Sequence, residues 1–191
     1  TNIKIKLGAT NDGKLVAGEA HLIYESGAFP GSPVPGGCNC IMGPYDIPNT
    51  YLEGLDVLVN PPKSAAYRAP GSPVAAWGIE SAINMLAEEL GMDQIDLRLK
   101  NAAREGTKTH YGPTFKDIGM IATLEAAKNS PHYQTPLKAG QGRGVAVGFW
   151  FNIMTWDEGG QQNSGPSIPA INQPYQDAFD KDHAVFLRAT L

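Results

Sequence analysis

Residues 72–101, SPVAAWGIESAINMLAEELGMDQIDLRLKN, decide the fold class of this chain. Ser72-Pro73 is typical of a helix start, with an N-cap followed by proline at the first helical position. Apolar residues then recur at helical spacing up to Gly91, which is typical of a helix end. Asp93 predicts the N-cap of a second helix that runs through Asn101. We therefore expect two consecutive helices in the middle of the chain.

Strand patterns surround these helices. Apolar and basic residues alternate over residues 3–7, a turn signal follows at 11–14, and β-rich residues resume over 15–24. This order predicts an antiparallel hairpin. The further predicted strands cover residues 55–59, 144–154 (a buried strand) and 184–191.

A third helix is predicted over residues 115–128, whereas residues 25–50 are rich in glycine and proline and predict loops. Large aromatic residues stand at core-like positions, namely Trp77, Phe149, Trp150 and Phe151. Strands, then helices, then a strand predict an α+β fold. We expect an antiparallel or mixed sheet with a central group of three helices.

The composition excludes several classes of protein. The 191 residues include 42% hydrophobic residues, enough for a buried core, and carry a net charge of -4, which disfavours binding to nucleic acid by bulk charge. No stretch reaches the roughly 18 consecutive apolar residues of a membrane span. The chain begins at Thr1 with neither methionine nor an apolar leader, so we expect a piece of a longer protein.

The two cysteines, Cys38 and Cys40, are separated by one residue. A disulfide across this spacing would be strained, and the four histidines are scattered without metal-ligand spacing. We expect two reduced, partly buried thiols, with a redox or metal role as the alternative. Reduced thiols favour a cytoplasmic protein, and a periplasmic one is the alternative.

Residues 60–73 form the candidate site. A tight loop that ends at a helix N-terminus is receptive to anions, and Arg68 adds a permanent charge with planar donors. Gly71 allows a ligand to approach the backbone closely. The alternative is a structural loop with Arg68 in a salt bridge. For Glu80, inside the following helix, we favour a hydrogen bond to loop backbone over acid–base catalysis.

The motifs around this loop resemble the molybdenum hydroxylases, the family of xanthine dehydrogenase, aldehyde oxidoreductase and aerobic carbon monoxide dehydrogenase. The resemblance is carried by YRAPGSP at 67–73, Glu80 and LAEELGMDQIDLRLKN at 86–101. Shorter pieces fit in order and spacing: LGA at 7–9, DG at 12–13, GAF at 27–29, GPYDIPN at 43–49, VN at 59–60, EG at 105–106 and TH at 109–110. Together the matches cover about residues 3–150.

The resemblance implies a piece of the molybdopterin-binding large subunit of an oxidoreductase, with that domain over residues 1–154 and a loop-rich tail of uncertain assignment over 155–191. It places the cofactor, molybdopterin with molybdenum, against Tyr67, Arg68, Ala69 and Gly71, and it turns Pro70 toward the substrate. The implied reaction is hydroxylation of a small molecule, an aldehyde or a nitrogen heterocycle, with water as the oxygen source. Iron–sulfur clusters and FAD would be carried by other domains or subunits.

The chain departs from the family pattern in ways that limit its function. Gly36 stands where purine-oxidising members carry an arginine, and Pro70 replaces their aromatic residue, which disfavours xanthine as substrate. The pterin-binding glutamine loops and the catalytic Gly-Glu have no counterpart. We therefore assign no catalytic residue and no metal ligand, and expect the chain alone to be inactive. The alternatives are a non-catalytic scaffold or subunit-association domain of the same ancestry, and a chance match in a generic binding module.

Overall fold

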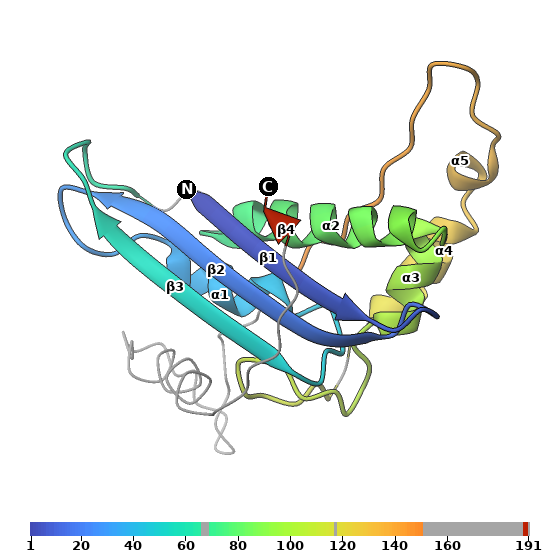
Figure 1. Ribbon diagram of the computed structural model, residues 1–191, viewed down its shortest axis with the longest axis horizontal. Coiled ribbons are helices and arrows are strands. Elements are labelled where there is room, and N and C mark those ends of the chain that lie inside the picture. Colours follow the sequence, from blue (N-terminus) through green and yellow to red (C-terminus); the bar gives the residue numbers. More distant parts are fainter. Residues whose placement is uncertain (66–68, 117, 151–188, 191) are drawn as a thin grey trace, which may run out of the picture.

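The computed structural model describes residues 1–65, 69–116, 118–150 and 189–190. Strands and helices alternate irregularly along the chain (Figure 1). In chain order they are β1 (Asn2–Ala9), β2 (Leu15–Gly27), α1 (Val34–Ile41), β3 (Thr50–Leu58), α2 (Ser72–Glu89), α3 (Gln94–Asn101), α4 (Met120–Lys128), α5 (Pro131–Gln134) and β4 (Ala189–Thr190).

The sheet is mixed, with strand order β3-β2-β1-β4. β1 and β2 form the predicted antiparallel hairpin, with Ile5 opposite Ala20. Lys100 of α3 reaches back to the turn of this hairpin and pairs with Asp12 at 2.8 Å. β3 runs parallel to β2 and begins five residues before the predicted strand. The first half of β3, TYLEG, has no regular alternation of polar and apolar residues, so the apolar pattern at 55–59 indicated only the second half of the strand.

Helices α1 and α2 lie on one face of the sheet (Figure 1). β1 packs against α2 at Gly78, where an added Cβ would stand 3.1 Å from Ile3 and 3.2 Å from Ile5. Ile79 and Ile83 of the same helix are buried in the core. This arrangement confirms an α+β fold with a mixed sheet.

Two helices differ from the sequence predictions. α1 lies inside residues 25–50, which were predicted as loops. Its first turn contains Pro35, Gly36 and Gly37, which have poor helix propensity, but the helix is held by buried Val34, Cys38 and Ile41. The predicted helix 115–128 begins later, at Met120, because the Phe115 N–H donates to Thr107 and its carbonyl accepts from Gly106.

The predicted buried strand 144–154 is wrong over the part that the structure describes. Residues 144–150, which we call the strap, are extended and alternate between half-buried and exposed positions, but they join no sheet. Residues 151–154 lie outside the described part. Of the predicted strand 184–191, only Ala189–Thr190 are described; they form β4, which pairs with β1 at Lys4 and Ile5.

Exposed aromatic residues correct a further prediction. Trp77 in α2 is 64% exposed, and Trp150 is exposed at the end of the strap, so neither belongs to the core. Phe149 is half-buried, and Phe151 lies outside the described residues, as does most of the predicted tail 155–191. Within the described residues no helix is long and apolar enough to cross a membrane.

Candidate functional site

Of the candidate segment 60–73, the structure describes residues 60–65 and 69–73. Ala69, Pro70 and Gly71 form the 69–71 loop, which connects the segment after β3 to α2. Ala69 has φ 57° and Gly71 has φ 83°, so both adopt the left-handed conformation, which is unfavourable for alanine. Ala69 and Pro70 are half-buried, whereas Gly71 is buried. Two predicted site residues, Tyr67 and Arg68, lie outside the described residues.

The 69–71 loop packs backbone to backbone against the first turn of α1. A Cβ added to Gly71 would stand 2.2 Å from the carbonyl oxygen of Pro33 and 2.6 Å from the nitrogen of Gly37. A Cβ added to Gly36 would stand 2.3 Å from the carbonyl oxygen of Pro70. Glycine is therefore required on both sides of this contact. The resemblance had already drawn attention to Gly36, but sequence reasoning missed the helix α1 and its contact with the loop, although two adjacent glycines are a signal for close approach.

The N-termini of α1 and α2 meet at the 69–71 loop. The N-cap of α2 is Gly71 rather than the predicted Ser72, and Pro33 is the N-cap of α1. Neither N-cap makes a side-chain hydrogen bond, and neither helix has an acidic residue in its first turn. The positive ends of two helix dipoles therefore converge without an acidic side chain of their own to neutralise them, which suits an anionic group.

Tyr24 of β2 holds the 69–71 loop by a hydrogen bond to its backbone. Its hydroxyl donates to the carbonyl oxygen of Gly71 at 3.2 Å, and an added Cβ at Gly37 would stand 2.8 Å from the same hydroxyl. Burial raises the pKa of Tyr24, and the neighbouring Cys38 and Cys40 raise it further. The phenol therefore stays protonated at neutral pH and keeps its role as a donor.

Cys38 and Cys40 of α1 are buried and are not joined by a disulfide, which fits the reduced thiols expected from the sequence. His110 lies next to them, and its Nε2 is 2.8 Å from the carbonyl oxygen of Cys38. Burial lowers the pKa of His110 to about 4, so the ring is neutral at pH 7 and donates through Nε2. Among the described residues, no three His, Cys, Asp or Glu side chains are arranged to hold a metal ion.

Glu80 of α2 is the buried carboxylate nearest in sequence to the loop. One oxygen accepts from the hydroxyl of Tyr45, and the other accepts from Arg98 Nε at 2.9 Å and from the N–H of Val147 at 2.8 Å. The Arg98 side chain is fully buried. These bonds confirm the structural role expected for Glu80, whose carboxylate is occupied by three donors.

Comparisons with known proteins identify the family of this chain. The family model described as "Molybdopterin cofactor-binding domain" matches residues 1–102, and the chain belongs to this family. The large molybdopterin subunit of nicotinate dehydrogenase from Eubacterium barkeri is 38% identical over 128 residues, which are 64% of this chain and 30% of that protein. Aldehyde oxidoreductase from Megalodesulfovibrio gigas is 29% identical over 78% of this chain and 17% of its own length.

Solved structures support the same assignment. The crystal structure of aldehyde oxidoreductase from Desulfovibrio gigas superposes with a TM-score of 0.63 at 31% identity, over 69% of this chain and 15% of that one. The chain thus spans less than a third of the length of these relatives. The predicted molybdenum hydroxylase family is confirmed, and a chance match in a generic binding module is excluded.

Proposed function

We propose that this chain is the part of an oxidoreductase large subunit that contacts the molybdenum-bearing molybdopterin through Tyr67, Arg68, Ala69 and Gly71. The observation that carries the proposal is the meeting of two helix N-termini at a half-buried loop whose packing admits no side chain at Gly36 or Gly71. Such a place suits the anionic groups of a pterin cofactor. Arg68 supplies the permanent positive charge and planar donors for the same purpose.

In this proposal, the residues of the chain itself hold and orient the cofactor and the substrate. Tyr24 fixes Gly71, and the glycines of α1 allow the 69–71 loop to rest directly on helix backbone. Pro70, half-buried beside Gly36, faces the substrate. When bound, the molybdenum cofactor supplies the redox chemistry of hydroxylation with water as the oxygen source.

The proposed reaction needs groups that the described residues do not offer. The buried carboxylate of Glu80 is committed to Tyr45, Arg98 and Val147, so we assign the base to another part of the large subunit. Iron–sulfur clusters and FAD, on other domains or subunits, would carry the electrons away. The partners of this chain are therefore the remaining parts of the large subunit and these redox modules.

For the substrate we propose an aldehyde, a nitrogen heterocycle or a similar small molecule. The names of two relatives, nicotinate dehydrogenase and aldehyde oxidoreductase, support these two classes. At the contact between Gly36 and Pro70 the chain presents backbone and a proline ring rather than a charged or aromatic side chain. This composition favours a substrate held by shape over a purine held by an arginine.

The test uses the molybdenum-loaded large subunit that contains this chain, with the variant Arg68→Ala. We expect lower molybdenum content and lower turnover, with an unchanged circular dichroism spectrum. Arg104→Ala is the matched control, since Arg104 is an exposed arginine outside the site. Equal molybdenum content and turnover in both variants would contradict the role of Arg68. A wild-type subunit that carries no molybdenum would instead indicate the non-catalytic scaffold.

A further inference from the structure

Ser72 uses its hydroxyl in a way that a helix start does not require. A serine at the N-cap commonly accepts a hydrogen bond from a backbone N–H, but Ser72 is the first residue of α2, after the N-cap Gly71. The Oγ of Ser72 instead donates to the carbonyl oxygen of Phe149 in the strap, at 2.7 Å. The N–H of the same residue donates to the carbonyl oxygen of Ala69 at 3.2 Å. Ser72, which is buried, therefore joins the 69–71 loop to the strap.

The 69–71 loop needs support from outside itself. Ala69 in the left-handed conformation is strained, and such a conformation persists only when the surroundings enforce it. Tyr24 provides one support through its 3.2 Å hydrogen bond to Gly71. The hydrogen bond from Ser72 to the strap is shorter, at 2.7 Å, and acts one residue further along, where α2 begins.

The strap is a fixed partner for Ser72 because buried side chains hold its backbone. The N–H of Val147 donates to Glu80 at 2.8 Å, and the carbonyl oxygen of Val145 accepts from Arg98 at 2.9 Å. The ring of Phe149 lies over Gly43, where an added Cβ would stand 2.4 Å from it. The carbonyl oxygen that Ser72 binds is thereby anchored at several points.

We propose that Ser72 is a positioning residue for the 69–71 loop. The buried Glu80–Arg98 pair holds the strap in place. The hydroxyl of Ser72 connects the strap to the 69–71 loop and so restricts the motion of that loop, which contacts the cofactor in the proposed function. The relevance of this support to the cofactor rests on the proposed function, whereas the support itself is a property of the chain alone. No contact between Ser72 and the cofactor is needed.

The experiment is backbone amide hydrogen exchange, followed by NMR, on the full 191-residue chain and three variants. In Ser72→Ala we expect the amides of Ser72 and Ala75, which bond to Ala69 and Gly71, to exchange about five to ten times faster. Ser81→Ala is the matched control, since Ser81 lies on the same helix and its hydroxyl donates to the carbonyl oxygen of Trp77, one turn earlier in that helix. Ser72→Thr, which keeps the hydroxyl, should remain within about twofold of the wild type.

Three results would overturn the proposal. The first is equal exchange in the Ser72→Ala and Ser81→Ala variants. The second is fast exchange in Ser72→Thr as well, because the hydroxyl is retained there. The third is an equal acceleration in β1 and β2, which would indicate general destabilisation instead of a local effect.

A second readout addresses the cofactor. In the molybdenum-loaded large subunit, Ser72→Ala should change the electron paramagnetic resonance signature of the metal, and Ser81→Ala should leave it unchanged. Hydrogen exchange needs no cofactor, so the role of Ser72 and the proposed function are tested independently of each other. A wild-type subunit without molybdenum overturns the proposed function, and unaltered exchange in Ser72→Ala overturns the role of Ser72.

Discussion

Gly71 must be glycine for two reasons, its backbone conformation and its close contact with the backbone of α1. Its φ of 83° disfavours any side chain, and the carbonyl oxygen of Pro33 would stand 2.2 Å from a Cβ. For Gly71→Ala we expect a loss of about 3 kcal/mol or more in the free energy of unfolding, measured with urea, because conformational strain adds to a backbone collision. Gly91→Ala is the control: Gly91 has φ 62° but nothing within 4 Å, so only about 1 kcal/mol should be lost. Equal losses would contradict the close contact.

The buried ring of His110 makes stability depend on pH. Its pKa in the folded chain is about 4, below the ordinary value of 6.5. The neutral form is therefore favoured by folding, and its contribution is complete above pH 6.5 and is lost as the pH falls toward 4. We expect a loss of about 3 kcal/mol over this range, and His110→Gln should remove it. His132→Gln, at an exposed histidine, is the control; an unchanged pH profile in His110→Gln would contradict the prediction.

His21 should show the opposite dependence. Burial lowers the pKa of His21, but hydrogen bonds to Glu19 and Glu53, at 2.6 and 2.7 Å, outweigh it and raise the pKa above its ordinary value. The contribution of the charged ring is therefore present below pH 6.5 and is lost as the pH rises through the raised pKa. Urea unfolding of His21→Gln at a series of pH values should show a smaller decline on the alkaline side than the wild type. A steeper decline would contradict the assignment.

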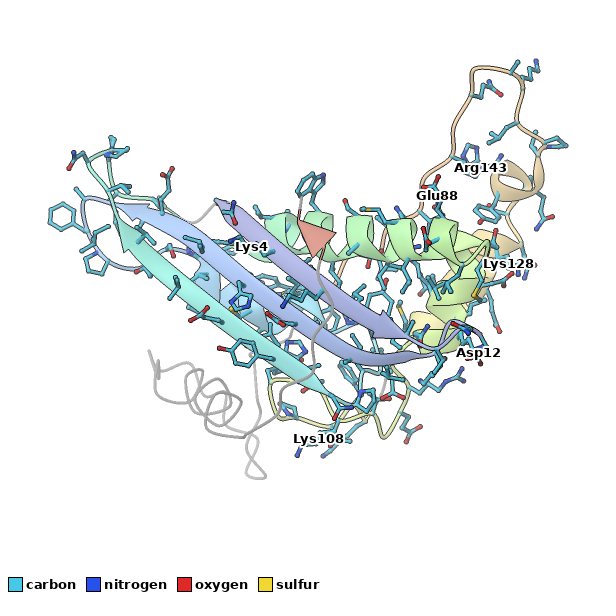
Figure 2. All side chains as sticks on the ribbon, in the orientation of Figure 1. Lys4, Asp12, Glu88, Lys108, Lys128 and Arg143 are labelled. Atoms are coloured by element: carbon cyan, nitrogen blue, oxygen red, sulfur yellow. The ribbon has the colours of Figure 1, made fainter. Side chains whose placement is uncertain are left out.

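At the scale of elements, the strap depends on the Glu80–Arg98 pair. Glu80→Gln would leave the fully buried guanidinium of Arg98 without its counter-charge. We expect a loss of about 3–5 kcal/mol in the free energy of unfolding. Glu88→Gln is the matched control on the same helix, and Figure 2 shows Glu88 on the side of α2 away from the sheet. Equal stability of the two variants would show that the pair does not hold the strap.

Local patterns predicted the elements that carry their own periodicity and caps. The hairpin and α2 were recognisable for this reason, and the N-cap of α3 at Asp93 is confirmed by its bonds to Ile95 and Asp96. The strap could not be distinguished from a strand, because its alternation is genuine. Its hydrogen-bond partners, however, are side chains of α2 and α3 that lie far away in the sequence.

The candidate site was predictable only in part. The motif around the 69–71 loop points to this segment, and its role in binding the cofactor stays a prediction. The contribution of α1 is a tertiary feature: Gly36 and Pro70 are 34 positions apart in the sequence, and nothing local indicates that they touch. The contribution of Tyr24 is also a tertiary feature, because its hydroxyl reaches the loop only when β2 packs against it.

At the scale of the whole molecule, the proposed function gives this chain one side of a binding site. It spans 30% of the nicotinate dehydrogenase large molybdopterin subunit and 15% of the aldehyde oxidoreductase structure. We therefore expect the isolated 191-residue chain to retain little or no molybdopterin, because the rest of the pocket is supplied elsewhere. Mass spectrometry under native conditions checks this expectation. Stoichiometric retention of the cofactor by the isolated chain would contradict it.

The most direct measurement is a crystal structure of the complete large subunit with its molybdenum cofactor bound. We expect Arg68 and the 69–71 loop to contact the cofactor, with the N-termini of α1 and α2 directed at its anionic groups. A structure in which Arg68 pairs with an ordinary carboxylate, and in which the cofactor lies away from this loop, would contradict the proposed function.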